Sequence, residues 1–154
     1  MVIGLMKQET ALKLLKAGEN VFLTGSAGAG KTYTLNQYIN YLKARKVPVA
    51  ITASTGIAAT HMNGMTIHTW AGIGIKDFLS DADLKNMKER KYLKEHLENA
   101  QVLIIDEISM LHAKQLNLVN QVLKYFKESD AAFGGIQVIV AGDFFQLPPV
   151  GRND

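Results

Sequence analysis

The chain has 154 residues, of which 47% are hydrophobic and 20% are charged, with a formal net charge of +3 and no cysteine. This length and apolar content suit one domain with its own core, and they exclude a disordered chain, a disulfide framework and a cysteine-based zinc site. The slight basic balance permits a nucleic-acid partner without predicting one.

The sequence indicates neither a membrane span nor a secretory signal. No apolar run approaches the ~20 residues that cross a bilayer, and residues 1–8 lack a long apolar core and a cleavage site. We therefore expect no membrane partner and an intracellular location, which in a bacterium means the cytoplasm or the nucleoid. The absence of cysteine is compatible with a reducing cytoplasm.

Helical and strand patterns alternate along the chain. The expected helices are residues 8–16, 33–46, 57–62, 80–99 and 113–127, and the expected strands are residues 21–23, 48–52, 101–105 and 136–141. The pattern at residues 65–75 is mixed. Ser54 or Thr55 is the expected cap of the third helix, and Ser80 with Asp83 matches a capping box at the fourth. Strands that alternate with helices predict an α/β fold with a mainly parallel sheet and right-handed crossovers.

A phosphate-loop pattern, G-x-x-x-x-G-K-[ST], stands between the first strand and the second helix. Its residues are Gly25, Ser26, Ala27, Gly28, Ala29, Gly30, Lys31 and Thr32. Backbone N–H groups from Gly28 to Lys31 can turn inward around an anion, and the helix that begins near Gly30 directs its positive end to the same point. Lys31 is the expected partner of the β- and γ-phosphates, and the Thr32 hydroxyl is an expected Mg²⁺ ligand. The alternative is a flexible glycine- and alanine-rich turn that caps a helix.

Two adjacent carboxylates, Asp106 and Glu107, follow an apolar strand. Side chains alternate along a strand, so the two acids need not do the same work. Asp106 is placed to hold Mg²⁺, directly or through water. Glu107 would then face the γ-phosphate and orient or deprotonate the attacking water. The alternative is a solvated Asp–Glu pair at the end of a strand.

Two glutamines are further candidates for nucleotide contacts. Gln146 follows the fourth strand, and its uncharged amide could hydrogen-bond the γ-phosphate or the attacking water, although a polar loop residue is an equal alternative. Gln8 could read adenine, because a carboxamide can pair with the N6 and N7 edge of that base. An exposed helix glutamine is the simpler interpretation of Gln8.

Other features of the sequence bear on nucleic acid or metal. Trp70 could stack on a base, but a single tryptophan is more often a core residue. The basic run at residues 85–91 is either the solvated face of a helix or a patch that contacts phosphates. The four histidines have no mutual spacing that suggests a metal site.

Taken in order, these motifs resemble those of superfamily I DNA helicases of the Pif type, which are akin to the RecD-like helicases. The resemblance is carried by Gln8, Ala11, Leu12 and the stretches at 25–32, 52–59 (TASTGIAA), 64–68 (GMTIH), 105–110 (IDEISM) and 142–149 (GDFFQLPP). The stretches STGIAA and GDFFQLPP are much more specific than the phosphate loop. The resemblance implies a first RecA-like domain, a three-layer α/β sandwich. In it the strand at 136–141 would lie between the phosphate-loop strand and the Asp106 strand.

The resemblance also implies an activity and a set of contacts. It implies an ATP-dependent DNA helicase that uses ATP and Mg²⁺, in which Gln8 contacts adenine and Gln146 couples the γ-phosphate to domain movement. Thr55, Gly56 and His68 would lie along single-stranded DNA. Residues 72–83 would hold a small wedge that splits the duplex of forked DNA, with movement from 5′ to 3′.

One departure from the family pattern limits the expected activity. The sequence stops at Asp154, and the second RecA-like domain, which in the family completes the ATP site with arginines, is absent. Arginine fingers contribute on the order of 10³–10⁵ in rate. We therefore expect this chain to bind Mg·ATP, to hydrolyse it very slowly and to unwind nothing alone. The alternatives are a phosphate-loop kinase for a small molecule, which would need lid arginines, and an ATP-switched DNA-binding module that does not unwind.

Overall fold

The structure, a computed structural model, describes residues 2–3, 8–24 and 29–142. Within these residues, six parallel strands form one sheet in the order β1-β2-β6-β5-β3-β4. The strands are β1 (Val2–Ile3), β2 (Val21–Thr24), β3 (Val49–Ala53), β4 (Met65–Thr66), β5 (Val102–Asp106) and β6 (Gln137–Gly142). The α-helices are α1 (Gln8–Lys16), α2 (Ala29–Ala44), α3 (Gly56–His61), α4 (Ile67–Ala71), α5 (Asp81–Lys88), α6 (Lys91–Asn99) and α7 (Ala113–Lys127). The 3₁₀ helices are η1 (Ile108–Met110) and η2 (Ala132–Gly135). Because β6 lies between β2 and β5, the strand order implied by the resemblance is confirmed.

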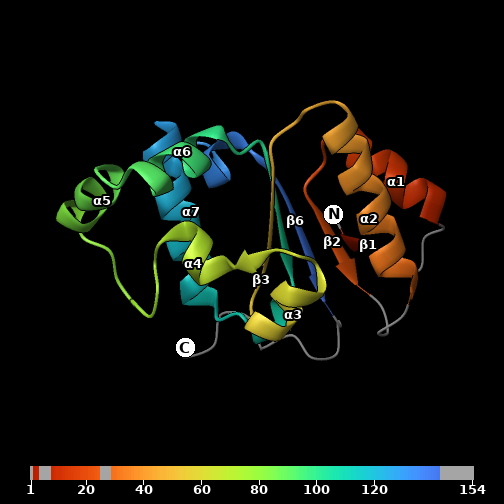
Figure 1. The fold of residues 1–154 in the computed structure, drawn as a ribbon, viewed down its shortest axis with the longest axis horizontal. Helices are drawn as coiled ribbons and strands as arrows, with labels where there is room; N and C mark the ends of the chain where they lie inside the picture. Colours follow the sequence, from red (N-terminus) through yellow and green to blue (C-terminus); the bar gives the residue numbers. More distant parts are fainter. Residues whose placement is uncertain (1, 4–7, 25–28, 143–154) are drawn as a thin grey trace.

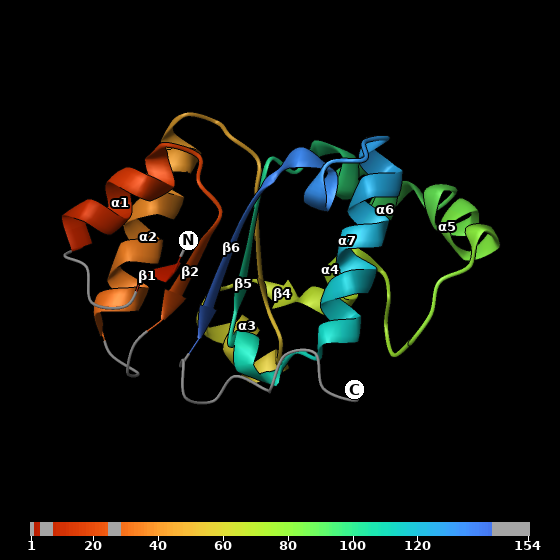
Figure 2. The same cartoon turned by 180° about the vertical axis from the view of Figure 1, so that it is seen from behind.

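Helices cover both faces of this sheet, as Figure 1 shows. Helices α1 and α2 pack on one face through one apolar cluster, and α4, α6 and α7 pack on the other through a second cluster. The view from behind in Figure 2 shows the same three layers, with α5 at the end of the molecule opposite α1. None of the described helices combines the length and the apolar content needed to cross a membrane. The predicted three-layer α/β sandwich with a parallel sheet is therefore confirmed.

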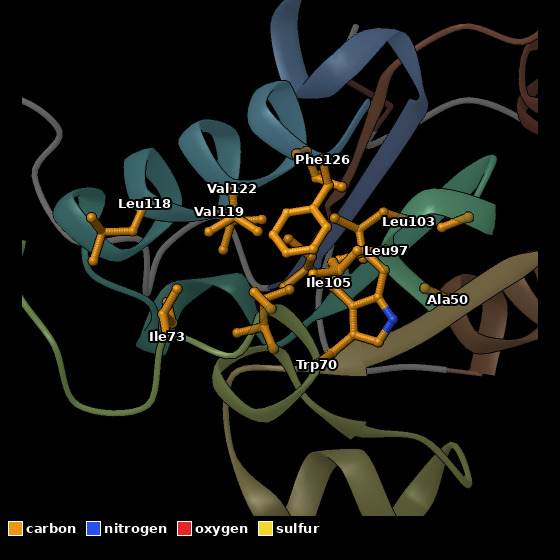
Figure 3. Packing of buried hydrophobic residues seen from close by; sticks show 14 of the residues in the cluster. Ala50, Trp70, Ile73, Leu97, Leu103, Ile105, Leu118, Val119, Val122 and Phe126 are labelled. Atoms are coloured by element: carbon orange, nitrogen blue, oxygen red, sulfur yellow. The ribbon is translucent and has the colours of Figure 1, made fainter. Parts of the chain in front are cut away.

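The sequence of the central strand β5 is continuously apolar because both faces of the strand are buried. Its Val102 and Ile104 belong to the cluster beneath α1 and α2, whereas Leu103 and Ile105 belong to the cluster beneath α7. Figure 3 shows the second cluster, with Phe126 of α7 beside the β5 side chains. A strand that is buried on both faces has no polar side to alternate with, which is typical of parallel sheets.

Local capping explains several of the element boundaries. Thr55, and not Ser54, caps α3, because its hydroxyl accepts the Ala58 N–H at 3.2 Å. Ser80 and Asp83 form the predicted capping box at the start of α5, with bonds of 3.1 and 2.9 Å. Helix α7 spans the same residues that the periodicity predicts.

The prediction of one helix over residues 80–99 is wrong. The chain turns at Glu89 and Arg90, and Arg90 has extended backbone angles (φ −84°, ψ 105°). Each of the two helices buries its own apolar pair in the α7-side cluster, and these pairs are Leu84 with Met87 and Leu93 with Leu97. No proline or glycine marks the break, so tertiary packing rather than local sequence sets it.

The mixed pattern at residues 65–75 resolves into the short strand β4 and the short helix α4. Thr66 ends β4 and caps α4, because its hydroxyl accepts the Thr69 N–H at 3.3 Å. Gly72 ends α4 in the left-handed region, with φ 73°. An added Cβ atom there would lie 2.8 Å from a methyl carbon of Leu93, so both the backbone angle and the close packing favour glycine.

Candidate functional site

The candidate residues emerge at one edge of the sheet. Strand β2 ends level with β6, since Thr24 pairs with Gly142, and β5 ends level with β3, since Asp106 pairs with Ala53. All four strands are parallel, so the segments that follow them leave the sheet on the same side. This carboxyl edge is where ligands of open α/β sheets bind.

The described part of the phosphate loop opens helix α2. Gly25, Ser26, Ala27 and Gly28 lie outside the described residues, whereas Ala29 and Gly30 form the start of the helix. In this first turn Lys31 is half-buried and Thr32 is exposed. The turn carries no acidic residue, so nothing within it offsets the positive end of the helix dipole. An anion beside this turn would therefore be stabilised.

One buried hydroxyl lies directly before the loop. The Thr24 Oγ1 atom at the end of β2 is buried and has no hydrogen-bond partner among the described residues. A buried polar atom without a partner costs free energy, which a ligand or a neighbouring group can recover. Together with the Thr32 hydroxyl and the Asp106 carboxylate, it provides hard oxygen atoms of the kind that Mg²⁺ prefers. The residues present therefore fit a magnesium–nucleotide complex.

The two carboxylates occupy different environments. Asp106 is the last residue of β5 and is half-buried, whereas Glu107 is exposed and has left-handed backbone angles (φ 56°, ψ 45°). The Asp106 Oδ1 atom accepts the Glu107 N–H at 2.9 Å. A left-handed residue other than glycine costs roughly 1–2 kcal/mol, and such positions cluster at functional sites.

The end of β6 packs tightly against the turn that carries Glu107. A Cβ atom on Gly142 would lie 2.9 Å from the Ile108 Cγ2 atom and 3.2 Å from the Ile108 nitrogen. Strand β6 thus closes on η1 without room for a side chain. Gln146, the candidate for sensing the γ-phosphate, lies outside the described residues, and nothing is described of the side chain of Gln8 at the start of α1.

The candidates for DNA contact lie beside β3 and β4. Thr55 is half-buried as the cap of α3, Gly56 is exposed in its first turn, and His68 is half-buried on α4. Helices α3 and α4 both contact β4. The structure therefore brings these three residues to neighbouring elements at the β4 edge of the sheet.

Trp70 does not join them. Its side chain is only 4% exposed and belongs to the core cluster shown in Figure 3. The His96 ring lies 5.5 Å from it between centroids, and the His96 Nε2 atom hydrogen-bonds the Trp70 carbonyl oxygen. The base-stacking hypothesis for Trp70 is therefore corrected, because a ring buried in the core presents no face to DNA.

The basic run at residues 85–91 has a mixed environment. Lys85, Arg90 and Lys91 are exposed, whereas the Lys88 ammonium lies 5.1 Å from the centroid of the Tyr125 ring. Lys88 thus contributes to the contact between α5 and α7.

A contact that the sequence does not predict joins the residue before Thr55 to the two carboxylate residues. The Ser54 hydroxyl, directly after β3, donates to the Glu107 carbonyl oxygen, and the Ser54 N–H donates to the Asp106 carbonyl oxygen at 3.0 Å. The sequence predicts Ser54 as a possible helix cap and gives it no contact with Glu107. The one available signal is that Ser54 is a polar residue at the end of a buried strand. This position predicts a hydrogen bond but does not indicate its partner.

Comparisons with known proteins cover nearly the whole chain. A family model described as PIF1-like helicase matches residues 6–154. The chain is 74% identical over 148 residues to the ATP-dependent DNA helicase Pif1 of Psychrobacter sp. (strain PRwf-1), which covers 96% of this chain and 22% of that protein. It is similar to the crystal structure of Pif1 helicase from Candida albicans, with a TM-score of 0.86 and 41% identity, covering 97% of this chain and 34% of that one. It is also similar to a crystal structure of Pif1 helicase from Bacteroides in complex with ADP-AlF3 and ssDNA. There the TM-score is 0.77 and the identity 37%, covering 95% of this chain and 33% of the other. The chain thus spans about a fifth of the length of the curated relative that it matches.

Proposed function

The chain belongs to the PIF1-like helicase family, and from this premise we propose that it is the first RecA-like domain of an ATP-dependent DNA helicase. The whole protein would translocate on single-stranded DNA and unwind duplex DNA. The observation that carries the proposal is the shared carboxyl edge. There Lys31 at the start of α2 and the Asp106–Glu107 pair at the end of β5 stand on either side of β6. The similar Bacteroides Pif1 helicase was solved with ADP-AlF3 and ssDNA, and we carry both ligand classes over to this chain.

Each residue of the nucleotide site has a proposed role. Lys31 holds the β- and γ-phosphates, aided by the uncompensated positive end of α2. Thr32 and Asp106 hold Mg²⁺, which when bound neutralises the charge that develops on the phosphates. Glu107 orients or deprotonates the attacking water. Gln8 would contact adenine and Gln146 would sense the γ-phosphate, as the resemblance implies.

The DNA contacts lie on the other side of the same edge. Thr55, Gly56 and His68 would follow the single strand, and the wedge would lie within residues 72–83. There Ile75 is 98% exposed and Phe78 is 73% exposed. The segment that carries them is anchored at both ends by the buried side chains of Ile73 and Leu79. Large apolar side chains exposed to solvent are suited to stacking against the last base pair of a fork.

We further propose that the isolated chain is a poor enzyme and that movement runs from 5′ to 3′ in the complete protein. The catalytic arginines of the family belong to a second RecA-like domain, and their loss lowers phosphoryl transfer by about 10³–10⁵. Binding of ATP would draw the two domains together and hydrolysis would release them.

The proposal is tested by the response of ATP turnover to candidate substrates. The complete protein that contains this chain should hydrolyse ATP faster when a single-stranded oligonucleotide is added, and it should separate the strands of a fork. Stimulation by nucleosides or sugars instead would indicate a small-molecule kinase. DNA binding without strand separation would indicate an ATP-switched binding module.

A further inference from the structure

We propose that Ser54 is a positioning residue that couples DNA at Thr55 to the backbone of Glu107, and thereby sets how strongly DNA accelerates ATP hydrolysis. This inference rests on the proposed function, because it takes Thr55 as a DNA contact and Glu107 as the residue that handles water. It assigns to Ser54 a role in the reaction that differs from capping or strand pairing.

Ser54 joins β3 to both carboxylate residues. It is 8% exposed, so its contacts are not exchanged freely with water. Its N–H donates to the Asp106 carbonyl oxygen at 3.0 Å, and its hydroxyl donates to the Glu107 carbonyl oxygen at 2.5 Å. A single buried residue therefore holds the peptide groups on both sides of the Glu107 Cα atom.

Glu107 needs such support because its backbone is in an unfavourable region. With φ 56° and ψ 45° it is left-handed, and an L-residue other than glycine stays there only when its surroundings fix it. The Glu107 carbonyl oxygen also accepts the Met110 N–H at 3.1 Å, so η1 and Ser54 hold the same atom from two sides. Loss of the Ser54 hydroxyl would free the peptide group after Glu107 to rotate. With that peptide group free, the Glu107 backbone can relax out of the left-handed region, and the accompanying change in φ turns the side chain.

Ser54 is also bonded directly to the DNA side of the site. Thr55 shares a peptide bond with it and caps α3 through the Ala58 N–H. A DNA phosphate that accepts the Ala58 N–H in place of the Thr55 hydroxyl would displace that cap and shift the Thr55 peptide group. One peptide unit and one hydrogen bond then separate this shift from the Glu107 carbonyl. The path is short enough to link the two sites without a movement of the whole domain.

The chain offers a matched control two residues earlier on the same strand. The Thr52 hydroxyl is fully buried and donates to the Ile104 carbonyl oxygen at 2.7 Å. It makes the same kind of bond between β3 and β5, but to a residue within the sheet rather than at the carboxyl edge. Ser54→Ala and Thr52→Val each remove one buried hydroxyl and keep the remaining shape. A general loosening of the two strands would affect both variants alike.

The experiment measures ATP turnover by the complete helicase with and without saturating oligothymidine. It also measures the Kd values for nucleotide and for oligonucleotide and the melting temperature. We expect Ser54→Ala to lower the ratio of DNA-stimulated to basal turnover about three- to tenfold, the range of one buried hydrogen bond. The two Kd values should change by less than about twofold, since the removed bond contacts neither ligand. Thr52→Val should keep the ratio even if its melting temperature falls. If Ser54→Ala does not fold, Ser54→Cys keeps the side-chain size with a weaker donor and should lower the ratio in the same direction.

The possible results distinguish a failure of the Ser54 coupling role from a failure of the proposed helicase function. An unchanged ratio in Ser54→Ala overturns the coupling role and leaves the helicase proposal standing. An equal loss in Thr52→Val shows a general packing effect and also overturns it. Absence of any stimulation by DNA in the unmodified protein overturns the proposed function, and the coupling role with it.

Discussion

The substitution Gly64→Ala tests how closely the chain between α3 and β4 approaches strand β3. The proposed DNA contacts lie on both sides of this segment, on α3 and on α4. A Cβ atom on Gly64 would lie 2.2 Å from the Ile51 carbonyl oxygen and 2.9 Å from its carbonyl carbon, and both are backbone atoms of β3. Relief of these contacts requires the two segments to separate by about 1 Å. The next residue, Met65, begins β4 and pairs with Thr52, so the separation would disturb the pairing of β4.

The magnitude follows from the nature of the obstacle. Overpacking a filled site costs about 1–3 kcal/mol, and a backbone obstacle cannot turn aside as a side chain can, so we expect a loss of about 3 kcal/mol. For a chain of this size that loss lowers the melting temperature by about 6–12 °C. Strand β4 leads directly into α4, so affinity for single-stranded DNA should fall, whereas nucleotide affinity at α2 should hold.

Urea unfolding followed by far-UV circular dichroism measures the loss. Gly56→Ala is the control for stability, because a Cβ atom there meets nothing within 4 Å and the residue has ordinary backbone angles. It should change the free energy of unfolding by less than about 0.5 kcal/mol. If Gly64→Ala unfolds at the same urea concentration as the unmodified chain, the close approach of residues 63–64 to β3 is refuted.

Three further outcomes are expected. Lys31→Ala should weaken Mg·ATP binding about 30-fold or more in calorimetry, with an unchanged circular dichroism spectrum, and undiminished affinity would remove the loop from the site. Emission from Trp70, the one tryptophan of the chain, should be blue-shifted, and an oligonucleotide should not quench it directly, whereas strong quenching would restore the base-stacking hypothesis. The Ser80 backbone N–H and then the Ser80 hydroxyl hold the pKa of Asp83 below its usual value. Since the folded pKa is the lower one, this stabilisation is present at neutral pH and disappears as the pH falls through it. Asp83→Asn should therefore flatten the acid side of the stability curve, and an unaltered slope would contradict the capping role.

The parts of the fold that could be predicted are those with strong local signals. Helix α7 has an apolar face of regular spacing, and β5 is a continuous apolar run, so both follow from periodicity alone. The phosphate-loop pattern likewise indicated a strand before it and a helix after it, and the structure has β2 and α2 in those places. Such features depend on neighbours within a few residues, which the sequence displays directly.

The features that escaped prediction depend on distant contacts. The break between α5 and α6 follows from where two apolar pairs meet α7. For Trp70 the sequence left a core position and base stacking both open, with the core position the commoner, because the choice depends on how α4 folds onto α6 and α7. The bond from Ser54 to Glu107 joins residues 53 positions apart in the sequence. No local pattern distinguishes a serine that will hold a strained carboxylate residue from one that caps a helix.

The direct pairing of β3 with β5 brings the proposed DNA contacts next to Glu107, the residue proposed to handle the attacking water. Residues Val49–Ala53 pair with Val102–Asp106 in unbroken register, which sets Ser54 beside Glu107 at the edge. An intervening strand would add about 4.8 Å between them, beyond the reach of a hydrogen bond. On the other side, one strand, β6, lies between β5 and β2, so Lys31 and the two carboxylates follow strands that flank β6. In the proposed function, this strand order gives Glu107 a carboxyl edge in common with Lys31, while Ser54 after β3 holds the Glu107 backbone.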